Sequence, residues 1–315
     1  MKTSAKKSAN MFQGLWGKRT TPAKPTAKSK PKPKVRATTP AAENDGERTL
    51  DQYKGPAHLV AANLLWGPDR LWPYDKASEK ALPWQAGEGT HIGILGASLG
   101  AWGRNVADQV PTATITEFDW RTDVSRWRLE RDRAQAAEQT FYEVNLGVLL
   151  PPPVRCSCLL GVEPIFAQAG SSLLRWARLA LEPGGALVLE ELAIDSPAMP
   201  AREVRNGWMV RGSAGAQWLK LDEQESILRR NGFALGNVRE RTGAHLRAIR
   251  LALDEAEERY ETLSKAMKRS PSLKNVADHF KCEWKTAKNR LKALERGALA
   301  VYRIEVIKPR ADELI

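Results

Sequence analysis

Residues 181–189, with the sequence LEPGGALVL, hold the transition that decides the fold of this chain. The residues before it, 171–181, form a helix pattern. The Pro-Gly-Gly sequence at 183–185 ends such a helix, because proline lacks a backbone N–H and glycine accepts the left-handed turn that follows. Residues 186–192, ALVLEEL, are then typical of a buried strand. The stretch predicts a helix, a tight turn and a buried strand in succession.

The same alternation of helix and strand patterns continues on both sides of this stretch. Strands that alternate with helices favour a parallel, doubly wound sheet with helices on both faces, because crossover connections are right-handed. We therefore predict an α/β fold whose ligand site lies at the carboxyl ends of the strands. Strand patterns occupy 91–96, 113–120, 140–146, 154–162 and 233–242, and helix patterns occupy 57–67, 99–110, 123–140 and 221–232.

The C-terminal third adds a helical segment and one more strand. In 298–309, ALAVYRIEVIKP, the residues Ala300, Tyr302, Ile304 and Val306 alternate with the residues between them, as on a strand with two different faces. We expect this strand to be antiparallel and the last of a seven-stranded sheet, with the helical residues before it covering the strand ends. His245, near the start of that cover, is a candidate to face the site. The predicted organisation is a tail at 1–52, an α/β core at 53–242, a helical cover at 243–297 and the last strand at 298–315.

The net charge of +12 is concentrated at the N-terminus. Residues 1–36 contain eleven lysines and arginines and no acidic residue, which leaves +1 for the rest of the chain. This Lys-, Pro-, Ala- and Thr-rich composition predicts disorder, because little apolar surface offsets the entropy of ordering. The tail is a candidate contact for a protein or an anionic surface. Nucleic-acid binding by the folded body is not expected, because phosphate neutralisation supplies most of that affinity.

The composition also excludes several classes of protein. No apolar run approaches the roughly 20 residues of a membrane-spanning helix, so we expect no transmembrane segment. The cysteines Cys156, Cys158 and Cys282 form no CxxC pair and no even set of disulfides, which predicts a reducing, cytoplasmic setting. Four histidines without a Cys/His cluster argue against a metal site.

A glycine-rich turn follows the first predicted strand. In 93–103, GILGASLGAWG, the residues Gly96, Ser98 and Gly100 separate an apolar strand from a helix. Glycines at such a turn let the backbone approach a ligand, and the helix N-terminus offers free N–H groups. The next strand ends with Glu117 and Asp119, where a carboxylate accepts hydrogen bonds from ribose hydroxyls. The turn and the acids together predict a nucleotide-type cofactor site.

The glycine turn, the acids and the Pro-Gly-Gly turn together resemble the class I S-adenosylmethionine-dependent methyltransferases. The stretches LLWGPDRLWPYD (64–75) and CLLGVEPIF (158–166) are similar to the leader and the fourth strand of the branch that methylates amines, quinones or lipid-like acceptors. The resemblance implies S-adenosylmethionine as cofactor and a small-molecule acceptor. The implied site residues are Gly96, Ser98 and Gly100 for the methionine part of the cofactor, Asp119 or else Glu117 for the ribose, Asn145 or Glu143 for the adenine amine, and Glu163 for the methyl-transfer centre, with His245 as a second catalytic candidate.

Other interpretations of these residues stay open. The glycines also suit mere helix–strand packing, the acids suit polar strand ends, and Glu163 suits a helix cap. Ile94, Ser98 and Ala101 depart from the family pattern, as in a catalytically inactive methyltransferase-like scaffold.

A further alternative is a nucleic-acid-associated protein that uses the basic tail and residues 272–306. That segment resembles a helix-turn-helix with a wing, with Ala277 at the small-residue position. Lys281 stands at the turn position, where glycine is preferred. The residues that would meet DNA are Thr286, Lys288, Asn289 and Arg290.

Overall fold

The structure is a computed structural model that describes residues 53–73, 89–96, 99–135, 140–148, 150, 152–163, 165, 171–196 and 218–310. The chain divides into two compact units, Met1–Glu43 and Asn44–Ile315, and every described residue belongs to the second. The predicted tail at 1–52 and the site candidate Ser98 lie outside the described residues.

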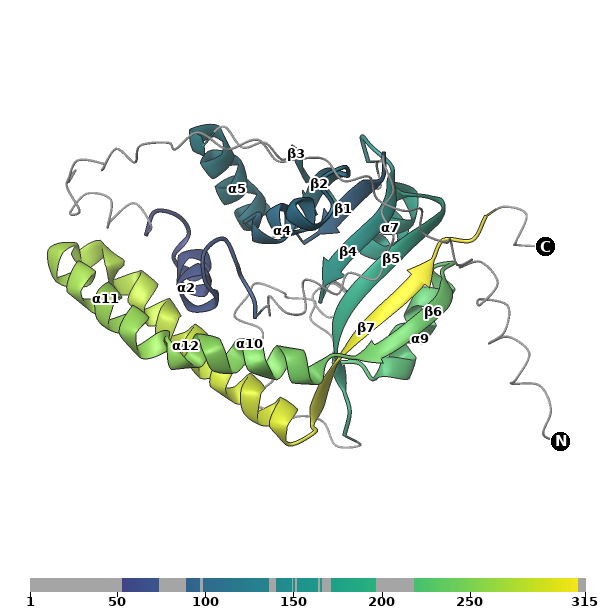
Figure 1. The fold of residues 1–315 in the computed structure, drawn as a ribbon. Helices are drawn as coiled ribbons and strands as arrows, with labels where there is room; N and C mark the ends of the chain where they lie inside the picture. The colour runs from purple at the N-terminus through teal and green to yellow at the C-terminus, as the bar shows by residue number, and fades with distance from the viewer. Residues whose placement is uncertain are drawn as a thin grey trace, which may run out of the picture. The chain divides into compact units, whose positions relative to one another are not determined.

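The second unit is built around a seven-stranded sheet with the strand order β3-β2-β1-β4-β5-β7-β6 (Figure 1). Strands β1 to β5 pair in parallel, whereas β7 is antiparallel to both β5 and β6. The predicted α/β class, the mostly parallel sheet and the antiparallel last strand are confirmed. The strands are β1 (His91–Leu95), β2 (Thr114–Asp119), β3 (Thr140–Glu143), β4 (Cys156–Val162), β5 (Leu181–Ile194), β6 (Ala234–Glu240) and β7 (Leu299–Ile307). The helices are α2 (Ala57–Trp66), α4 (Ala101–Gln109), α5 (Thr122–Gln135), α7 (Ser171–Ala180), α9 (Leu221–Arg230), α10 (Thr242–Asp254), α11 (Ala256–Arg269), the short 3-10 helix η2 (Pro271–Leu273) and α12 (Lys274–Glu295).

Side chains from the two faces of the sheet pack into separate hydrophobic clusters. On β4, Cys158, Leu160 and Val162 belong to one cluster, whereas Leu159 between them belongs to the other. Because successive side chains of a strand point to opposite faces, the clusters mark the two faces of the sheet. The first contains side chains from α2, α4, α5 and α10 to α12, and the second contains side chains from α7 and α9. Helices therefore cover both faces, as the sequence predicts.

The Pro-Gly-Gly turn forms a bulge at the start of β5. Cys156 of β4 pairs with Leu181, but Cys158 pairs with Ala186, so residues 182–185 are looped out between the two pairs. Gly184 has a φ of 80°, and its N–H donates to the carbonyl of Lys308 at 2.8 Å. This positive φ explains the need for glycine. The predicted helix and strand are present, but β5 already begins at Leu181, so the Pro-Gly-Gly turn lies within the strand and does not separate it from α7.

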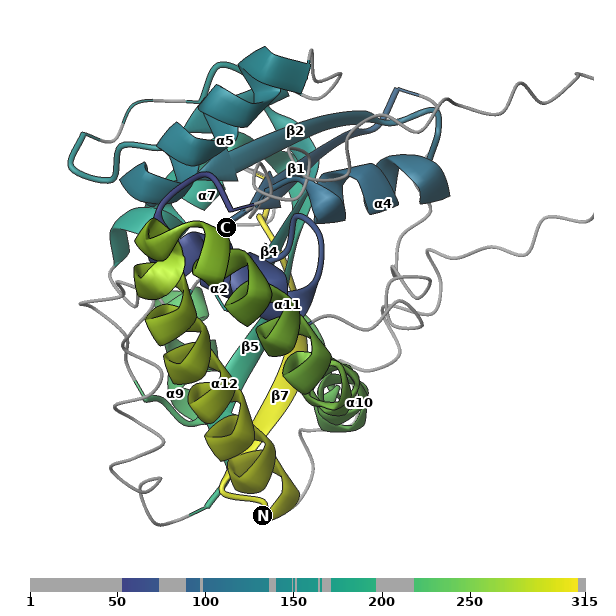
Figure 2. The same ribbon diagram turned by 90° about the vertical axis from the view of Figure 1, so that its left-hand side faces the viewer.

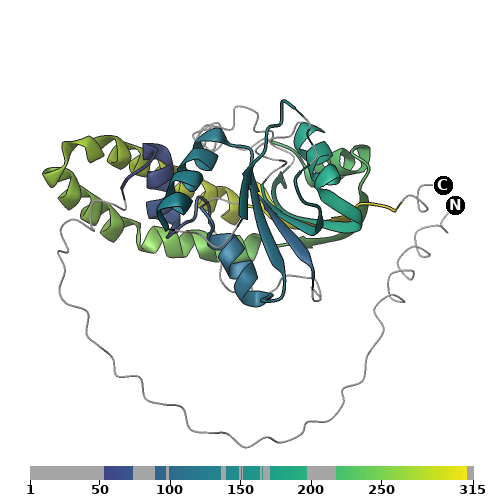
Figure 3. The ribbon, with the colours of Figure 1, turned by 90° about the horizontal axis from the view of Figure 1, so that it is seen from above.

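A layer of helices faces the carboxyl ends of the parallel strands. In Figure 2, α11 and α12 run side by side, and in Figure 3 they lie with α2 beyond the sheet. Arg259 of α11 donates hydrogen bonds to the carbonyls of Leu64 and Leu65 at 2.9 and 2.5 Å. The indole N–H of Trp66 donates to Glu283 of α12 at 2.7 Å. Because carbonyls in the last turn of a helix have no partner within it, these bonds fix α2 to the helical layer.

Helix α12 is uninterrupted from Lys274 to Glu295. A helix-turn-helix needs a turn at Lys281, so that alternative is wrong for this segment. Thr286 and Arg290, two of the residues proposed to meet DNA, are buried. The helix continues because buried residues recur at helical spacing along one side of it, from Ala277 and Phe280 to Arg290. Lys281 lies on the exposed side.

A buried ion pair joins the sheet to this helical layer. Glu163, the residue after β4, pairs with Arg290 of α12. Glu163 is 8% exposed and Arg290 1%. The backbone N–H of Glu163 donates to the carbonyl of Glu190 on β5 at 2.7 Å. Glu163 is therefore held at the carboxyl end of β4, with its main chain bonded to the neighbouring strand β5.

We expect Glu163→Gln to lower the free energy of unfolding by about 3 kcal/mol, because the buried guanidinium of Arg290 loses its countercharge. The double variant Glu163→Gln with Arg290→Met should recover much of that loss, since both charges are then gone. Urea denaturation measures both. The control, Glu295→Gln, loses an exposed 2.8 Å pair with Arg250 and should cost less than about 1 kcal/mol. Equal costs for the two single variants would contradict a role for the buried pair.

A second buried carboxylate lies within the sheet. Glu117 of β2 is fully buried and pairs with Arg128 of α5 at 2.7 Å. Burial raises the pKa of Glu117 to about 7, although the charge of Arg128 opposes this shift. The ordinary value is 4.5, so between pH 4.5 and about 7 Glu117 is protonated more in the folded chain than in the unfolded chain. Stability from Glu117 is therefore complete below pH 4.5 and is lost as the pH rises through about 7.

This linkage predicts that the wild-type chain loses about 3 kcal/mol of unfolding free energy, relative to Glu117→Gln, between pH 4.5 and 8. The glutamine stays neutral throughout, so other titrating groups cancel in the comparison. Urea denaturation of both chains at several pH values measures the difference. A gap between the two chains that does not change with pH would show that Glu117 has no raised pKa.

Candidate functional site

The strand order changes direction at β1, and α4 and α7, the helices that follow β1 and β4, pack on opposite faces of the sheet. From β1 the chain proceeds to β2 and β3 on one side, and β4 and β5 lie on the other side. Loops that leave adjacent strands in opposite directions separate at this point, where ligands of open α/β sheets bind. Gly96, Asp119 and Glu163 lie at the ends of β1, β2 and β4.

The glycine turn after β1 has a backbone that only glycine accepts readily. Gly96 and Gly100 have φ values of 74° and 96°. A Cβ atom on Gly100 would lie 1.6 Å from a guanidinium nitrogen of Arg128. A Cβ atom on Gly96 would lie 3.1 Å from the ring of Trp120. Gly100 thus has the packing role that the sequence left open, and Gly96 lies at the strand end beside an aromatic ring.

The two acids of β2 have different surroundings. Glu117 is enclosed between β2 and α5 by its pair with Arg128. Asp119 is the last residue of β2 and lies next to the turn, since the N–H of Gly96 donates to the carbonyl of Phe118 at 2.7 Å. Of the two ribose candidates, Asp119 is the one at the strand end.

Asp119 is held by Arg121, a contact that the sequence analysis missed. The backbone N–H and the Nε–H of Arg121 both donate to Oδ1 at 2.9 Å, and Nη2 donates to Oδ2 at 2.6 Å. The guanidinium lies 5.0 Å from the ring centre of Trp72 and 5.5 Å from that of Trp120. Asp119 is fully buried, so Arg121 is the charge that compensates it.

The remaining candidates lie on separate elements. Asn145, after β3, is exposed, and its side chain accepts the N–H of Gly147 at 2.9 Å. Glu143 is exposed and pairs in register with Asp119, so it reaches the same edge of the sheet. His245 is buried in the first turn of α10, a helix whose start is fixed to β7 by the 2.7 Å bond from the N–H of Arg241 to Val301. The structure thus places Gly96 beside the end of β2 that carries Asp119, and keeps His245 on the helical layer. Gly100 packs instead against Arg128.

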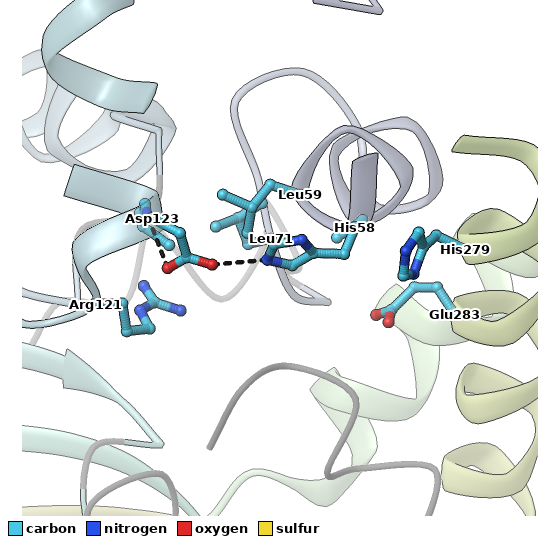
Figure 4. Close-up of a pocket in the computed structure, with 9 residues that line it drawn as sticks. His58, Leu59, Leu71, Arg121, Asp123, His279 and Glu283 are labelled. Atoms are coloured by element: carbon cyan, nitrogen blue, oxygen red, sulfur yellow. Dashed lines mark hydrogen bonds and ion pairs between the residues drawn. The ribbon is translucent and has the colours of Figure 1, made fainter. Parts of the chain in front are cut away.

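A pocket beside Arg121 was also missed by the sequence analysis. It lies between α2, the start of α5 and α12. Figure 4 shows His58 pointing toward Asp123, with His279 and Glu283 on the opposite side. His58 Nε2 and Asp123 Oδ2 are 2.7 Å apart. These residues are far apart in the chain, and no motif in the sequence links them.

Two structural findings limit the chemistry of the described residues. Within these ranges, no group of three or more His, Cys, Asp or Glu side chains is arranged to hold a metal ion. No helix in the described part of the chain has both the length and the apolar character needed to cross a bilayer.

Comparison with known proteins gives matches in structure alone. No protein-family model matches the sequence, and no curated protein matches it. The structure is similar to phosphoethanolamine N-methyltransferase 2 of Haemonchus contortus, solved with S-adenosylhomocysteine, at a TM-score of 0.66 and 16% identity, over 83% of this chain and 59% of that one. This chain therefore spans about three-fifths of the length of that relative.

Two further solved structures match over more of their own length. The cyclopropane synthase MmaA2 of Mycobacterium tuberculosis matches at a TM-score of 0.62 and 12% identity, over 84% of this chain and 100% of that one. The [4+2]-cyclase SpnF matches at 0.59 and 14% identity, over 84% of this chain and 95% of that one. With the strand order and the glycine turn, these likenesses show that the chain has the fold of the S-adenosylmethionine-dependent methyltransferases.

Proposed function

We propose that this chain binds S-adenosylmethionine and methylates a small-molecule acceptor. The observation that carries the proposal is the position of Asp119, at the end of β2 and beside the glycine turn after β1. A carboxylate at this place accepts hydrogen bonds from ribose hydroxyls in nucleotide-binding α/β folds. The relative from Haemonchus contortus, which was solved with S-adenosylhomocysteine, supports the choice of cofactor.

The residues after β1 fit this cofactor on two counts. Gly96 and Gly100 have left-handed backbones, which allow the tight turn between β1 and α4. Helix α4 begins at Ala101, immediately after the turn, and its first N–H groups have no partner within the helix. Gly96, Gly100 and Ser98 would hold the methionine part, and Asp119 the ribose.

Arg121 sets a condition on this fit. A carboxylate offers about four lone-pair positions, and three donors of Arg121 already use Asp119. Two ribose hydroxyls need two positions, so the guanidinium of Arg121 must move away from Asp119 when the ribose binds. Arg121 therefore competes with the cofactor for the same carboxylate.

The other candidates take supporting roles in the proposal. When bound, S-adenosylmethionine supplies an activated methyl group, so the protein has mainly to position the acceptor and to accept its proton. We propose Asn145 or Glu143 for the adenine amine, because both follow β3 at the edge shared with Asp119. Glu163, held by Arg290, would orient the acceptor, and His245 would face the site from the cover.

The wider organisation belongs to the same proposal. We propose that 53–242 form the α/β core, 243–297 the cover and 298–315 the last strand, with the basic segment 1–36 of the tail contacting a protein or an anionic surface. Cys156, Cys158 and Cys282 are free, and burial raises the pKa of Cys156 to about 12. Free thiols support a reducing compartment such as the cytoplasm.

We expect Asp119→Asn to weaken the binding of S-adenosylhomocysteine at least tenfold, because the ribose loses a charged acceptor. Arg121→Gln should instead tighten binding about tenfold, because the competing guanidinium is gone. Isothermal titration calorimetry measures both dissociation constants, and thermal unfolding verifies that the variants fold.

The matched control is Arg104→Gln, which removes an arginine of α4 that pairs with Asp69 at 2.5 Å and is 51% exposed. This variant should bind as the wild type does. If neither the wild type nor Arg121→Gln binds at millimolar ligand, the chain is not an S-adenosylmethionine-dependent enzyme. The methyltransferase-like scaffold would then be the remaining interpretation of the fold.

A further inference from the structure

The pocket next to Arg121 combines acidic, imidazole and apolar side chains. Asp123 lies at the start of α5, His58 on α2, and His279 and Glu283 on α12. Leu59, of α2, also lines the pocket. Arg121 lines it too and binds Asp119, so this pocket shares a wall with the proposed ribose site.

Asp123 and His58 form a fixed pair. Asp123 Oδ2 lies 2.7 Å from His58 Nε2, and Asp123 Oδ1 accepts the N–H of Val124 at 2.8 Å. The hydrogen bond with His58 holds the pKa of Asp123 below its ordinary value, so this side chain is a carboxylate at neutral pH. A carboxylate at Nε2 places the ring proton there. In the neutral ring, Nδ1 then keeps the lone pair and can accept a proton.

Helix α12 supplies the opposite wall. His279 and Glu283 are four residues apart and therefore share one face of the helix. The ring centres of His279 and His58 are 6.0 Å apart. One oxygen of Glu283 accepts the indole N–H of Trp66 at 2.7 Å, and the residue is 4% exposed. The second carboxylate of the pocket is thus held in place opposite Asp123 (Figure 4).

The charges that face the pocket favour a cation. Asp123 and Glu283 are acidic and Arg121 is basic, so the lining has an excess of one negative charge even when Arg121 has left Asp119 for the ribose. The imidazoles of His58 and His279 complete the polar lining, and neither adds positive charge in its neutral form. Two carboxylates beside apolar side chains suit an ammonium group on a small apolar body.

We propose that this pocket binds a small amine, with its ammonium group between Asp123 and Glu283 and with His58 as the base that deprotonates it. The proposal rests on the proposed function, because it names the class of acceptor for that reaction. The N–H bond of the ammonium breaks, its proton passes to Nδ1 of His58, and the electron pair stays on the amine nitrogen. The amine then has the lone pair that a methyl acceptor needs.

The test uses the four histidines of the chain as reporters in an NMR titration of the full chain. Propylamine, 1-propanol and propionate serve as cationic, neutral and anionic probes of similar size. Propylamine should shift the ring signals of His58 and His279 and leave that of His91, which does not line the pocket, unchanged. 1-Propanol and propionate should bind at least tenfold more weakly.

Asp123→Asn and Glu283→Gln should each weaken the binding of propylamine at least tenfold, because each removes a carboxylate from the pocket. Glu295→Gln is the matched control, since it neutralises an exposed acid of the same helix and should change nothing. If Asp123→Asn fails to fold, His58→Gln with His279 as the reporter takes its place. Stronger binding of propionate, or equal shifts at all four histidines, would overturn the proposal. Amine binding without binding of S-adenosylhomocysteine would contradict the proposed function alone, and the reverse result would contradict the amine site alone.

Discussion

The reversal of strand order at β1 is the constraint on which the rest of this structure depends. β1 pairs with β2 on one side and β4 on the other, and the helices after β1 and β4 cover opposite faces of the sheet. In open α/β sheets the ligand crevice is expected at this point. The glycine turn and Asp119 lie at that crevice because they end β1 and β2. The antiparallel pairing of β7 with β5 returns the chain to the sheet after α10 to α12. The helical layer is therefore tied to the same edge that carries the candidate site.

The fold of this chain and the reaction proposed for it have to be argued from different observations. Structures at 12% to 16% identity share its fold, and one of them is a [4+2]-cyclase, so the fold does not decide the reaction. The reaction has to be inferred from the charged groups at the strand ends. Asp119 is a buried carboxylate with one strong partner, Arg121, and the pair is partly exposed only on the arginine side. A buried carboxylate without a partner is strongly destabilising, so a ribose that binds Asp119 would have to replace the donors of Arg121 with its own hydroxyls.

The sequence predicted those features that local patterns determine. The alternation in 298–309 predicted β7, and the pattern of 171–192 predicted α7 and the buried part of β5, although β5 begins before the Pro-Gly-Gly turn. The wrong helix-turn-helix alternative came from the small residue Ala277 and the polar residues at 286–290, whereas Lys281 at the turn position already argued against it. The buried side of α12 continues past Lys281 without a break. Arg121 and the pocket of His58 and Asp123 could not be predicted, because they depend on contacts between α2, the end of β2 and α12. Pairings between distant segments follow from the tertiary fold and leave no periodic signal in the sequence.

The most direct test of the account is a crystal structure of the chain with S-adenosylhomocysteine. The account predicts the ligand at the carboxyl ends of β1 and β2, with its ribose hydroxyls on Asp119 and its methionine part against the turn of Gly96 and Gly100. It also predicts that the guanidinium of Arg121 has left Asp119. A ligand bound elsewhere, or a bound ribose that leaves the pair of Asp119 and Arg121 intact, would contradict the central claim.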